Sequence, residues 1–105
     1  MQGAKDILKR LENHDNSWPF KEAVDVSKVP DYTTVVKNPI DLKVVRKKYE
    51  SRLYTSKEEF KSDILLIFSN AKLYNSKDTI YYKYAEQLER EIMPSLNRLK
   101  EVEEK

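Results

Sequence analysis

The spacing of apolar residues along the chain predicts four amphipathic helices. In a helix, residues three or four positions apart lie on one face, so an apolar stripe with that spacing marks the side that packs inward. The first stripe consists of Ala4, Ile7, Leu8 and Leu11, and charged residues fill the positions between them. We expect this first helix to end near His14.

Two more helices are expected after Pro39. The first of them begins with Asp41 as its N-cap, and its inward positions are Leu42, Val45, Tyr49 and Leu53. The next begins at Ser56-Lys57-Glu58-Glu59, a capping box in which the Ser hydroxyl and the Glu carboxylate each accept from the other's backbone N–H. Its inward positions are Phe60, Ile64, Ile67, Phe68, Ala71 and Tyr74, widened by Leu65, Leu66 and Leu73. We therefore expect this third helix to be the most enclosed.

A polar break at Asn75-Ser76-Lys77-Asp78 separates the third helix from the last one. The inward positions of the last helix are Tyr81, Tyr84, Ala85, Leu88, Ile92, Leu96 and Leu99. Pro94 lies inside this stripe, and because an interior proline removes a backbone hydrogen bond, we expect it to kink or split the helix. The charged residues 101–105 are expected to fray.

The connection between the first and second helices is unusually long. Residues 13–39 show no periodicity and include Pro19, Pro30 and Pro39, so we interpret them as a loop without an element of its own. Loops of this length are functional or disordered. This one carries many apolar residues, namely Trp18, Phe20, Val24, Val26, Val29, Tyr32, Val35 and Val36. A disordered linker would not hold so much apolar surface, and an up-down topology could place this loop at the same end as the break at Asn75.

The composition fits one small helical domain. A chain of 105 residues has room for one hydrophobic core, which we place at about residues 4–100 of a single domain over residues 1–105. The single glycine argues against a sandwich or barrel of many short strands. Without cysteine, disulfides and thiolate nucleophiles are excluded. The longest strongly apolar run, Ile64–Phe68, is far shorter than the roughly 20 residues of a membrane span, so we expect no membrane contact. We also expect the protein to be intracellular and monomeric.

Catalysis and metal binding find little support. His14 is the only histidine and lies at a helix end, where histidine commonly interacts with the helix dipole. The only glycine is Gly3, so no glycine-rich phosphate loop exists. No His, Cys or Asp cluster has metal-ligand spacing. We expect neither an enzyme nor a cofactor or metal site.

A basic segment suggests nucleic acid binding as a competing function. It contains Lys43, Arg46, Lys47, Lys48 and Arg52. These are the outward positions of an amphipathic helix, so a solvated face is the favoured interpretation. A net charge of +2 and a pI near 8.7 are also mild, since a domain pI above about 9 is the usual sign of a nucleic acid binder.

Asn75 has two interpretations. It follows the third helix and could be a C-cap in the left-handed conformation, which asparagine tolerates. The residue alone favours this cap. Its aromatic neighbours Tyr74 and Tyr81, together with the apolar loop, keep open a second interpretation in which its amide binds a ligand.

Taken in order, these landmarks resemble a bromodomain over nearly the whole chain, to about Leu99. The landmarks are Ser17-Trp18-Pro19-Phe20, Val24, Val29-Pro30-Asp31-Tyr32, Lys37-Asn38-Pro39-Ile40-Asp41-Leu42, and Tyr74-Asn75 followed by Tyr81-Tyr82-Lys83. The loop length from Val24 to Pro30, and Tyr81, are most similar to bromodomains near the C-terminus of GNAT-type nuclear histone acetyltransferases. The resemblance implies a left-handed four-helix bundle, all-α, that binds acetyl-lysine of histone tails or other nuclear proteins as a nuclear module of a larger chromatin protein.

The resemblance also implies a role for each site residue. Asn75 would donate its amide to the acetyl carbonyl, and Tyr32 would contact the same oxygen through an ordered water. The remaining roles are a shelf of Trp18, Pro19 and Phe20, an apolar wall of Val24 and Val29, a floor or rim at Tyr74, and a gatekeeper at Tyr81. Ala23, Thr33 and Ile40 replace the commoner Pro, Tyr and Met, but the anchoring pair of Asn75 and Tyr32 is intact.

The chemistry of the ligand agrees with such a pocket. Acetylation turns the lysine ammonium into a neutral amide with a methyl group, so a suitable receptor is an apolar slot that ends in one amide donor. An unmodified ammonium in that slot would cost several kcal/mol, because we expect no carboxylate there to pair with it. A peptide that inserts one side chain should bind at about micromolar affinity or more weakly.

Overall fold

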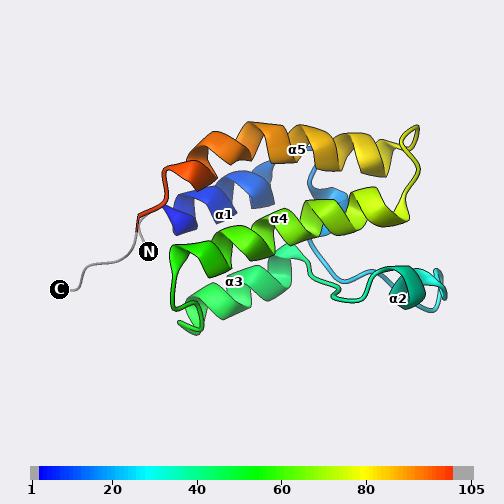
Figure 1. The fold of residues 1–105 in the computed structure, drawn as a ribbon, viewed down its shortest axis with the longest axis horizontal. Helices are drawn as coiled ribbons and strands as arrows, with labels where there is room; N and C mark the ends of the chain where they lie inside the picture. The colour runs from blue at the N-terminus through cyan, green and yellow to red at the C-terminus, as the bar shows by residue number, and fades with distance from the viewer. Residues whose placement is uncertain (1–2, 101–105) are drawn as a thin grey trace.

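The computed structural model describes residues 3–100, and within this range the chain is all-helical (Figure 1). The four main helices are α1 (Ala4–Asn13), α3 (Leu42–Glu50), α4 (Lys57–Tyr74) and α5 (Ile80–Asn97). A 3-10 helix, η1 (Trp18–Phe20), and a single helical turn, α2 (Tyr32–Val35), lie between α1 and α3. The predicted four-helix bundle with a long connection after the first helix is confirmed.

The connection itself was wrongly interpreted as free of secondary structure. Pro19 lies in the first positions of η1, where its fixed φ suits a helical turn and its missing N–H needs no partner. In α2 the Val36 N–H donates to the Tyr32 carbonyl at 2.7 Å and closes the turn. Elements of three and four residues are too short to produce a periodic apolar stripe, which explains why the pattern did not reveal them.

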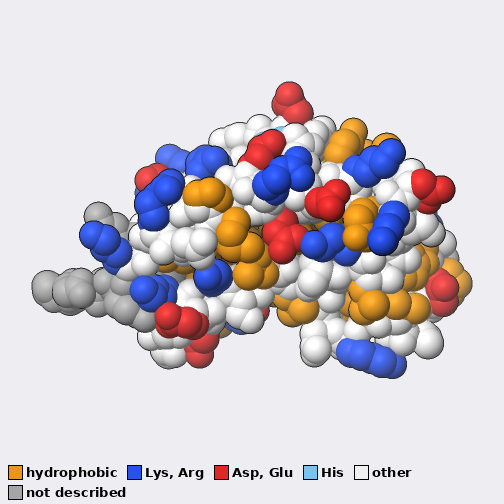
Figure 2. All heavy atoms as spheres, turned by 45° about the horizontal axis from the view of Figure 1, so that its top comes forward, with side chains coloured by type: hydrophobic (Ala, Val, Ile, Leu, Met, Phe, Trp, Pro, Cys, Tyr) orange, Lys and Arg blue, Asp and Glu red, His pale blue; other side chains and the backbone are white. Residues whose placement is uncertain are grey.

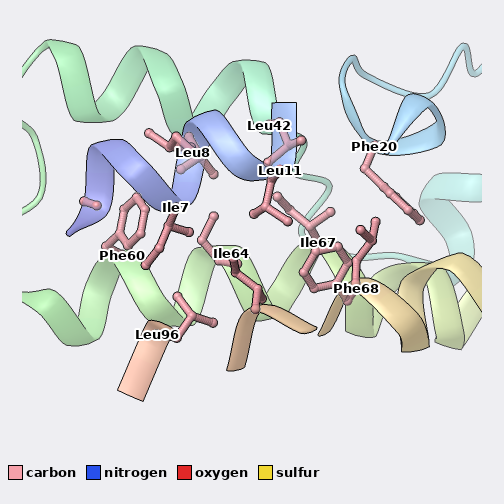
Figure 3. Packing of buried hydrophobic residues seen from close by; sticks show 14 of the residues in the cluster. Ile7, Leu8, Leu11, Phe20, Leu42, Phe60, Ile64, Ile67, Phe68 and Leu96 are labelled. Carbon is pink, nitrogen blue, oxygen red and sulfur yellow. The ribbon is translucent and has the colours of Figure 1, made fainter. Parts of the chain in front are cut away.

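The core lies between α1, α3, α4 and α5. Helix α4 packs against α3 and α5, and α1 packs against both of those helices. Phe60, Ile64 and Phe68 of α4 are fully buried in one cluster with Leu8 and Leu11 of α1, and Figure 3 shows these side chains pointing into the space between the helices. Burial of this apolar surface is the main source of the stability of the bundle.

Three residues that we expected to face inward are exposed. Leu53 is 60% exposed, because α3 ends at Glu50 and the chain turns at Arg52, whose φ is 59°. Leu73 is 62% exposed, since it lies on the side of α4 opposite Ala71. Tyr81 is 41% exposed and lies in the first turn of α5, at the end of the bundle. Tyr74, also expected in the core, is only half-buried.

Pro94 does not split the last helix. Helix α5 continues from Ile80 to Asn97 with Pro94 inside it, as Figure 1 shows. Pro94 and Arg90, four residues earlier, are both exposed, so the Arg90 carbonyl, which loses its hydrogen bond to position 94, lies on the side of the helix that faces solvent. Leu99 is buried as expected, but it lies beyond the end of the helix. The predicted fraying concerns residues 101–105, which lie outside the described residues.

The helix starts are capped as the sequence indicated. The Asp41 carboxylate accepts from the Val44 N–H at 2.9 Å, and the Ser56 hydroxyl accepts from the Glu59 N–H at 3.3 Å. The Glu59 carboxylate accepts from the Thr55 N–H at 2.8 Å, and the backbone N–H of Ser56, the expected donor, also bonds to it. This backbone hydrogen bond from Thr55 is the main cause of a lowered pKa at Glu59.

The basic segment of α3 is partly neutralised by neighbouring helices. Arg46 donates to both carboxylate oxygens of Glu12 on α1, at 3.0 and 2.6 Å. Lys48 pairs with Asp63 of α4 at 2.8 Å. These ion pairs favour a structural role for part of the segment. Figure 2 shows cations and carboxylates interspersed over the face in view. None of the described helices is long and apolar enough to cross a membrane.

Candidate functional site

One end of the bundle contains an open cavity of about 730 Å³. In Figure 1 the turn α2 and the connection between α4 and α5 lie at this end, and Figure 2 shows hydrophobic side chains gathered there. The structure places all nine residues singled out from the sequence in the lining of this cavity: Trp18, Pro19, Phe20, Val24, Val29, Tyr32, Tyr74, Asn75 and Tyr81. The long connection and the break at Asn75 therefore meet at one end, as the up-down topology suggested.

Asn75 ends α4 with its side chain at the cavity. Its φ of −98° and ψ of 146° are extended, so the expectation of a left-handed cap is wrong. Its backbone N–H and its side-chain amide both donate to the Ala71 carbonyl, at 3.0 and 2.9 Å. Because an asparagine amide carries two protons and a carbonyl oxygen, one proton and the oxygen remain without a partner among the described residues.

Two tyrosines stand beside Asn75. Tyr32 is buried and its ring meets the ring of Tyr74 edge-on, with centroids 5.0 Å apart. Burial raises the pKa of Tyr32, and the Asp41 carboxylate adds to this shift. The Tyr74 hydroxyl donates to the Asp31 carboxylate at 2.7 Å, and this bond is the main cause of its raised pKa. Both phenols are protonated near pH 7, and the Tyr74 proton is the one donated to Asp31.

The opposite side of the cavity is an aromatic shelf built on η1. Trp18 is 52% exposed, and it meets Tyr81 and Tyr84 of α5 edge-on at 5.9 and 6.3 Å between centroids. Phe20 is buried and packs edge-on against Phe68 at 5.7 Å. Figure 3 shows Phe20 reaching from the connection toward Phe68, so this residue anchors the shelf to the core as well as lining the cavity.

The apolar wall belongs to an arch between η1 and α2. Val24 is 38% exposed and Val29 is half-buried, and both line the cavity. Asp25 organises the arch locally, because its carboxylate accepts from the Ser27 N–H at 3.0 Å and the Ser27 hydroxyl at 2.6 Å. The Asp25 carbonyl accepts from the Val29 N–H at 3.2 Å. The wall is thus held in shape by a turn rather than by the core.

Sequence reasoning missed several residues of the cavity. Ile67 and Ala71 line it with Asn75, and their spacing of four residues on α4 is a signal that could have revealed the shared face. Glu22, which is exposed, also lines the cavity, and so does Asp41, which is buried. The expectation that no carboxylate lies there is therefore wrong. One of the Asp41 oxygens is engaged by the Val44 N–H as the cap of α3. No group of His, Cys, Asp or Glu within residues 3–100 has an arrangement that could hold a metal ion.

Asn70 was also missed, and it holds the connection in place. Its side chain is 7% exposed, and its amide donates to the Asn38 carbonyl at 2.8 Å. This bond ties the segment just before Pro39 and Ile40, which both line the cavity, to helix α4. A polar residue inside the apolar stripe of α4 is the signal that marked it, because buried polar groups are normally hydrogen-bonded.

The comparisons with known proteins settle the family. A family model described as Bromodomain matches residues 4–87. The chain belongs to the bromodomain family. This bromodomain is 51% identical over 86 residues to "Histone acetyltransferase GCN5" of Oryza sativa subsp. japonica, which covers 81% of the chain. It is 40% identical over 97 residues, 92% of the chain, to "Nucleosome-remodeling factor subunit NURF301" of Drosophila melanogaster.

Solved structures agree with this family. The bromodomain of human BAZ1A matches with a TM-score of 0.87 at 33% identity, over 92% of this chain and 91% of that one. CpBRD2 from cryptosporidium matches with a TM-score of 0.88 at 36% identity, over 94% and 92% of the two chains. The predicted likeness to bromodomains of histone acetyltransferases is confirmed.

Bromodomains are non-catalytic modules that bind proteins containing acetylated lysine, and this chain is such a module. It spans 17% of the length of the rice protein and 4% of the length of the fly protein. The activities of those whole proteins therefore do not transfer to this bromodomain by similarity alone.

Proposed function

We propose that this bromodomain binds acetylated histone tails or other acetylated nuclear proteins by receiving one acetyl-lysine in the cavity between Trp18 and Tyr32. The observation that carries the proposal is the position of Asn75, whose amide stands at an apolar cavity with a proton that Ala71 does not take. The acetyl carbonyl accepts this proton. The Asn75 oxygen remains available to accept from a donor of the ligand.

The other site residues complete the pocket in this proposal. Tyr32 contacts the acetyl oxygen through an ordered water, and its phenol, whose pKa is raised further by burial, is protonated near pH 7 and can donate. Trp18, Pro19 and Phe20 form the shelf along the lysine stem, while Val24 and Val29 form the wall. Tyr74 lies at the rim and Tyr81 narrows the entrance beside Trp18, a position that its exposure and its contact with the Trp18 ring support.

Selection of acetylated over unmodified lysine follows from the lining. A neutral acetyl amide finds one donor and an apolar surround, whereas an ammonium would lose its hydration. Two residues of the lining, Glu22 and Asp41, carry carboxylates that could attract the ammonium. Asp41 is held by the α3 N-terminus, and Glu22 is exposed to solvent. We expect an unmodified lysine peptide to bind at least tenfold more weakly, a difference of about 1.4 kcal/mol.

We further propose that residues 1–105 form one monomeric, non-catalytic bromodomain of a larger nuclear chromatin protein. The names of the relatives, which include histone acetyltransferases, a nucleosome-remodeling factor subunit and a transcription factor, support this setting. The module acts without a cofactor and without direct nucleic acid binding. The ion pairs of Arg46 and Lys48 with carboxylates of neighbouring helices support the last point.

Substitution of Asn75 tests the proposal. We expect Asn75→Ala to weaken binding of an acetylated histone peptide at least tenfold, because a buried acetyl carbonyl would lose its donor. Calorimetry measures the affinity, and circular dichroism and thermal unfolding check the fold. Asn13→Ala is the matched control, since Asn13 is exposed at the end of α1 on the main body of the bundle.

Two results would contradict the proposal. One is an Asn75→Ala variant that keeps the affinity of the unaltered protein for the acetylated peptide. The other is equal affinity of the unaltered protein for the acetylated and the unmodified form of the same peptide. A steep loss of affinity with added salt would instead indicate binding dominated by charge.

A further inference from the structure

Four polar side chains close a ring of hydrogen bonds between the start of the long connection and helix α5. The Asn16 backbone N–H donates to His14 Nδ1 at 3.0 Å, so the ring proton of a neutral His14 lies on Nε2, which donates to Glu91 at 3.0 Å. The Gln87 amide donates to the other oxygen of Glu91 at 2.9 Å. The Asn16 amide closes the ring by donating to the Gln87 oxygen at 2.8 Å.

This polar ring lies directly before the aromatic shelf. The Ser17 N–H donates to the His14 carbonyl at 3.1 Å, and the Phe20 N–H donates to the Ser17 carbonyl at 2.8 Å. The two turns connect the ring to η1 without a flexible segment between them. Trp18 then meets the Tyr81 and Tyr84 rings of α5 edge-on, at 5.9 and 6.3 Å between centroids.

Each member of the ring is matched to its neighbours as donor or acceptor. Glu91 accepts twice and donates nothing, whereas Gln87 accepts from Asn16 and donates to Glu91. The hydrogen bond from Gln87, followed by that from His14, lowers the pKa of Glu91. Glu91 is therefore ionised near pH 7, which is the state that the ring requires.

We infer that His14, Asn16, Gln87 and Glu91 are positioning residues for ligand binding, because their ring sets the distance and orientation of the Trp18 shelf relative to α5. The inference rests on the proposed acetyl-lysine pocket, of which this shelf forms one side. None of the four residues lines the cavity, so each of them acts through Trp18 and not by contact with the ligand.

Exchange of the acid and the amide within the ring tests the inference. In Gln87→Glu, two carboxylates face each other and the bond between positions 87 and 91 is lost. Adding Glu91→Gln restores it in the opposite direction: the new amide donates to the new carboxylate, and the partners of Asn16 and His14 remain acceptors. We expect Gln87→Glu to weaken binding of an acetylated histone peptide by about three- to tenfold and the double substitution to restore it to within about twofold.

Trp18 provides a readout that needs no ligand. It is the only tryptophan of the chain, so the emission spectrum of the free protein reports on the shelf alone. We expect the emission to shift in Gln87→Glu and to return in the double variant. Glu86→Gln is the control for a one-unit change of charge on α5, opposite in sign to that of Gln87→Glu, since Glu86 is exposed and no contact of its side chain is seen among the described residues.

The outcomes separate this inference from the proposed function. If Gln87→Glu binds the acetylated peptide as tightly as the unaltered protein and shows the same Trp18 emission, the inference is overturned. A lowered melting temperature alone would then show that the ring only stabilises the fold. Failure of the double variant to recover affinity and emission would also overturn it. If the unaltered protein binds no acetylated peptide, the proposed function is wrong, and the role of the ring in binding falls with it.

Discussion

The body of the bundle and its cavity end are held together in different ways. In the body, fully buried apolar side chains such as Phe60 and Ile64 pack between helices without directional bonds. At the cavity end, Trp18 and Tyr81 are 52% and 41% exposed, and single hydrogen bonds between residues far apart in sequence hold the connection. Substitutions in the body should therefore lower stability, whereas substitutions at the cavity end should mainly alter binding.

The largest expected effect is a loss of stability in the body. Phe60 is fully buried and meets Tyr54 edge-on at 5.5 Å between centroids, at the start of α4. Phe60→Ala removes this ring and leaves a cavity, so we expect the free energy of unfolding to fall by about 3–5 kcal/mol. Urea unfolding measures the change, and the fraction that remains folded should bind acetylated peptide with unaltered affinity.

A control distinguishes this effect from a general sensitivity of the region. Leu53 is close in sequence but 60% exposed, so Leu53→Ala should change the free energy of unfolding by less than about 0.5 kcal/mol. The folded fraction of Phe60→Ala could instead lose peptide affinity by a free energy as large as the loss in its free energy of unfolding. That result would show that the body and the cavity end do not respond separately.

Asn70 gives the next largest effect, because it joins the two regions. Its buried amide is a donor from α4 to the Asn38 carbonyl of the connection. Asn70→Ala leaves that carbonyl without its partner, and we expect a loss of about 1–3 kcal/mol in the free energy of unfolding. Since Pro39 and Ile40 lose their tie to α4, we also expect weaker binding of the acetylated peptide, measured by calorimetry.

An Asn70→Asp variant tests whether the hydrogen bond to the Asn38 carbonyl is what stabilises the connection. The carboxylate has the same shape but cannot donate to the Asn38 carbonyl, so it should lose at least as much stability as Asn70→Ala. An Asn70→Asp variant as stable as the unaltered protein would show that the observed hydrogen bond does not hold the connection.

The fold of the body could be predicted from the sequence more fully than the structure of the cavity end. The inward positions of α1 and most of those of α4 followed from helical spacing, because burial in the body requires a regular stripe. Leu53 and Leu73 were wrongly placed inside, since periodicity does not show where a helix ends or how wide its covered face is. Pro94 was expected to kink or split α5, and its exposed position explains why the helix continues.

At the cavity end, the family landmarks led to the nine lining residues. The short helices and hydrogen bonds that hold these residues in place were not predicted. The apolar residues of the long connection do not recur at a regular spacing, so η1 and α2 were missed. The bond from Tyr74 to Asp31 and the ring that includes Asn16 and Gln87 join residues 43 and 71 positions apart. Such pairs depend on how the elements fold together, and no local pattern indicates them.

The smallest expected effect concerns Ser17. Most substitutions lower the free energy of unfolding, whereas this one should leave it unchanged or raise it. Its hydroxyl is fully buried beside the shelf and has no hydrogen-bond partner among the described residues. An unpaired buried hydroxyl costs roughly 1–3 kcal/mol, so Ser17→Ala should leave the free energy of unfolding unchanged or raise it by up to about 1 kcal/mol. The same change at Ser56, whose hydroxyl caps α4, should lower it by about 0.5–2 kcal/mol. Chemical unfolding of both variants measures this difference.

A Ser17→Ala variant that loses as much stability as Ser56→Ala would show that the buried hydroxyl has a stabilising partner, and that the start of the shelf is held as firmly as the body.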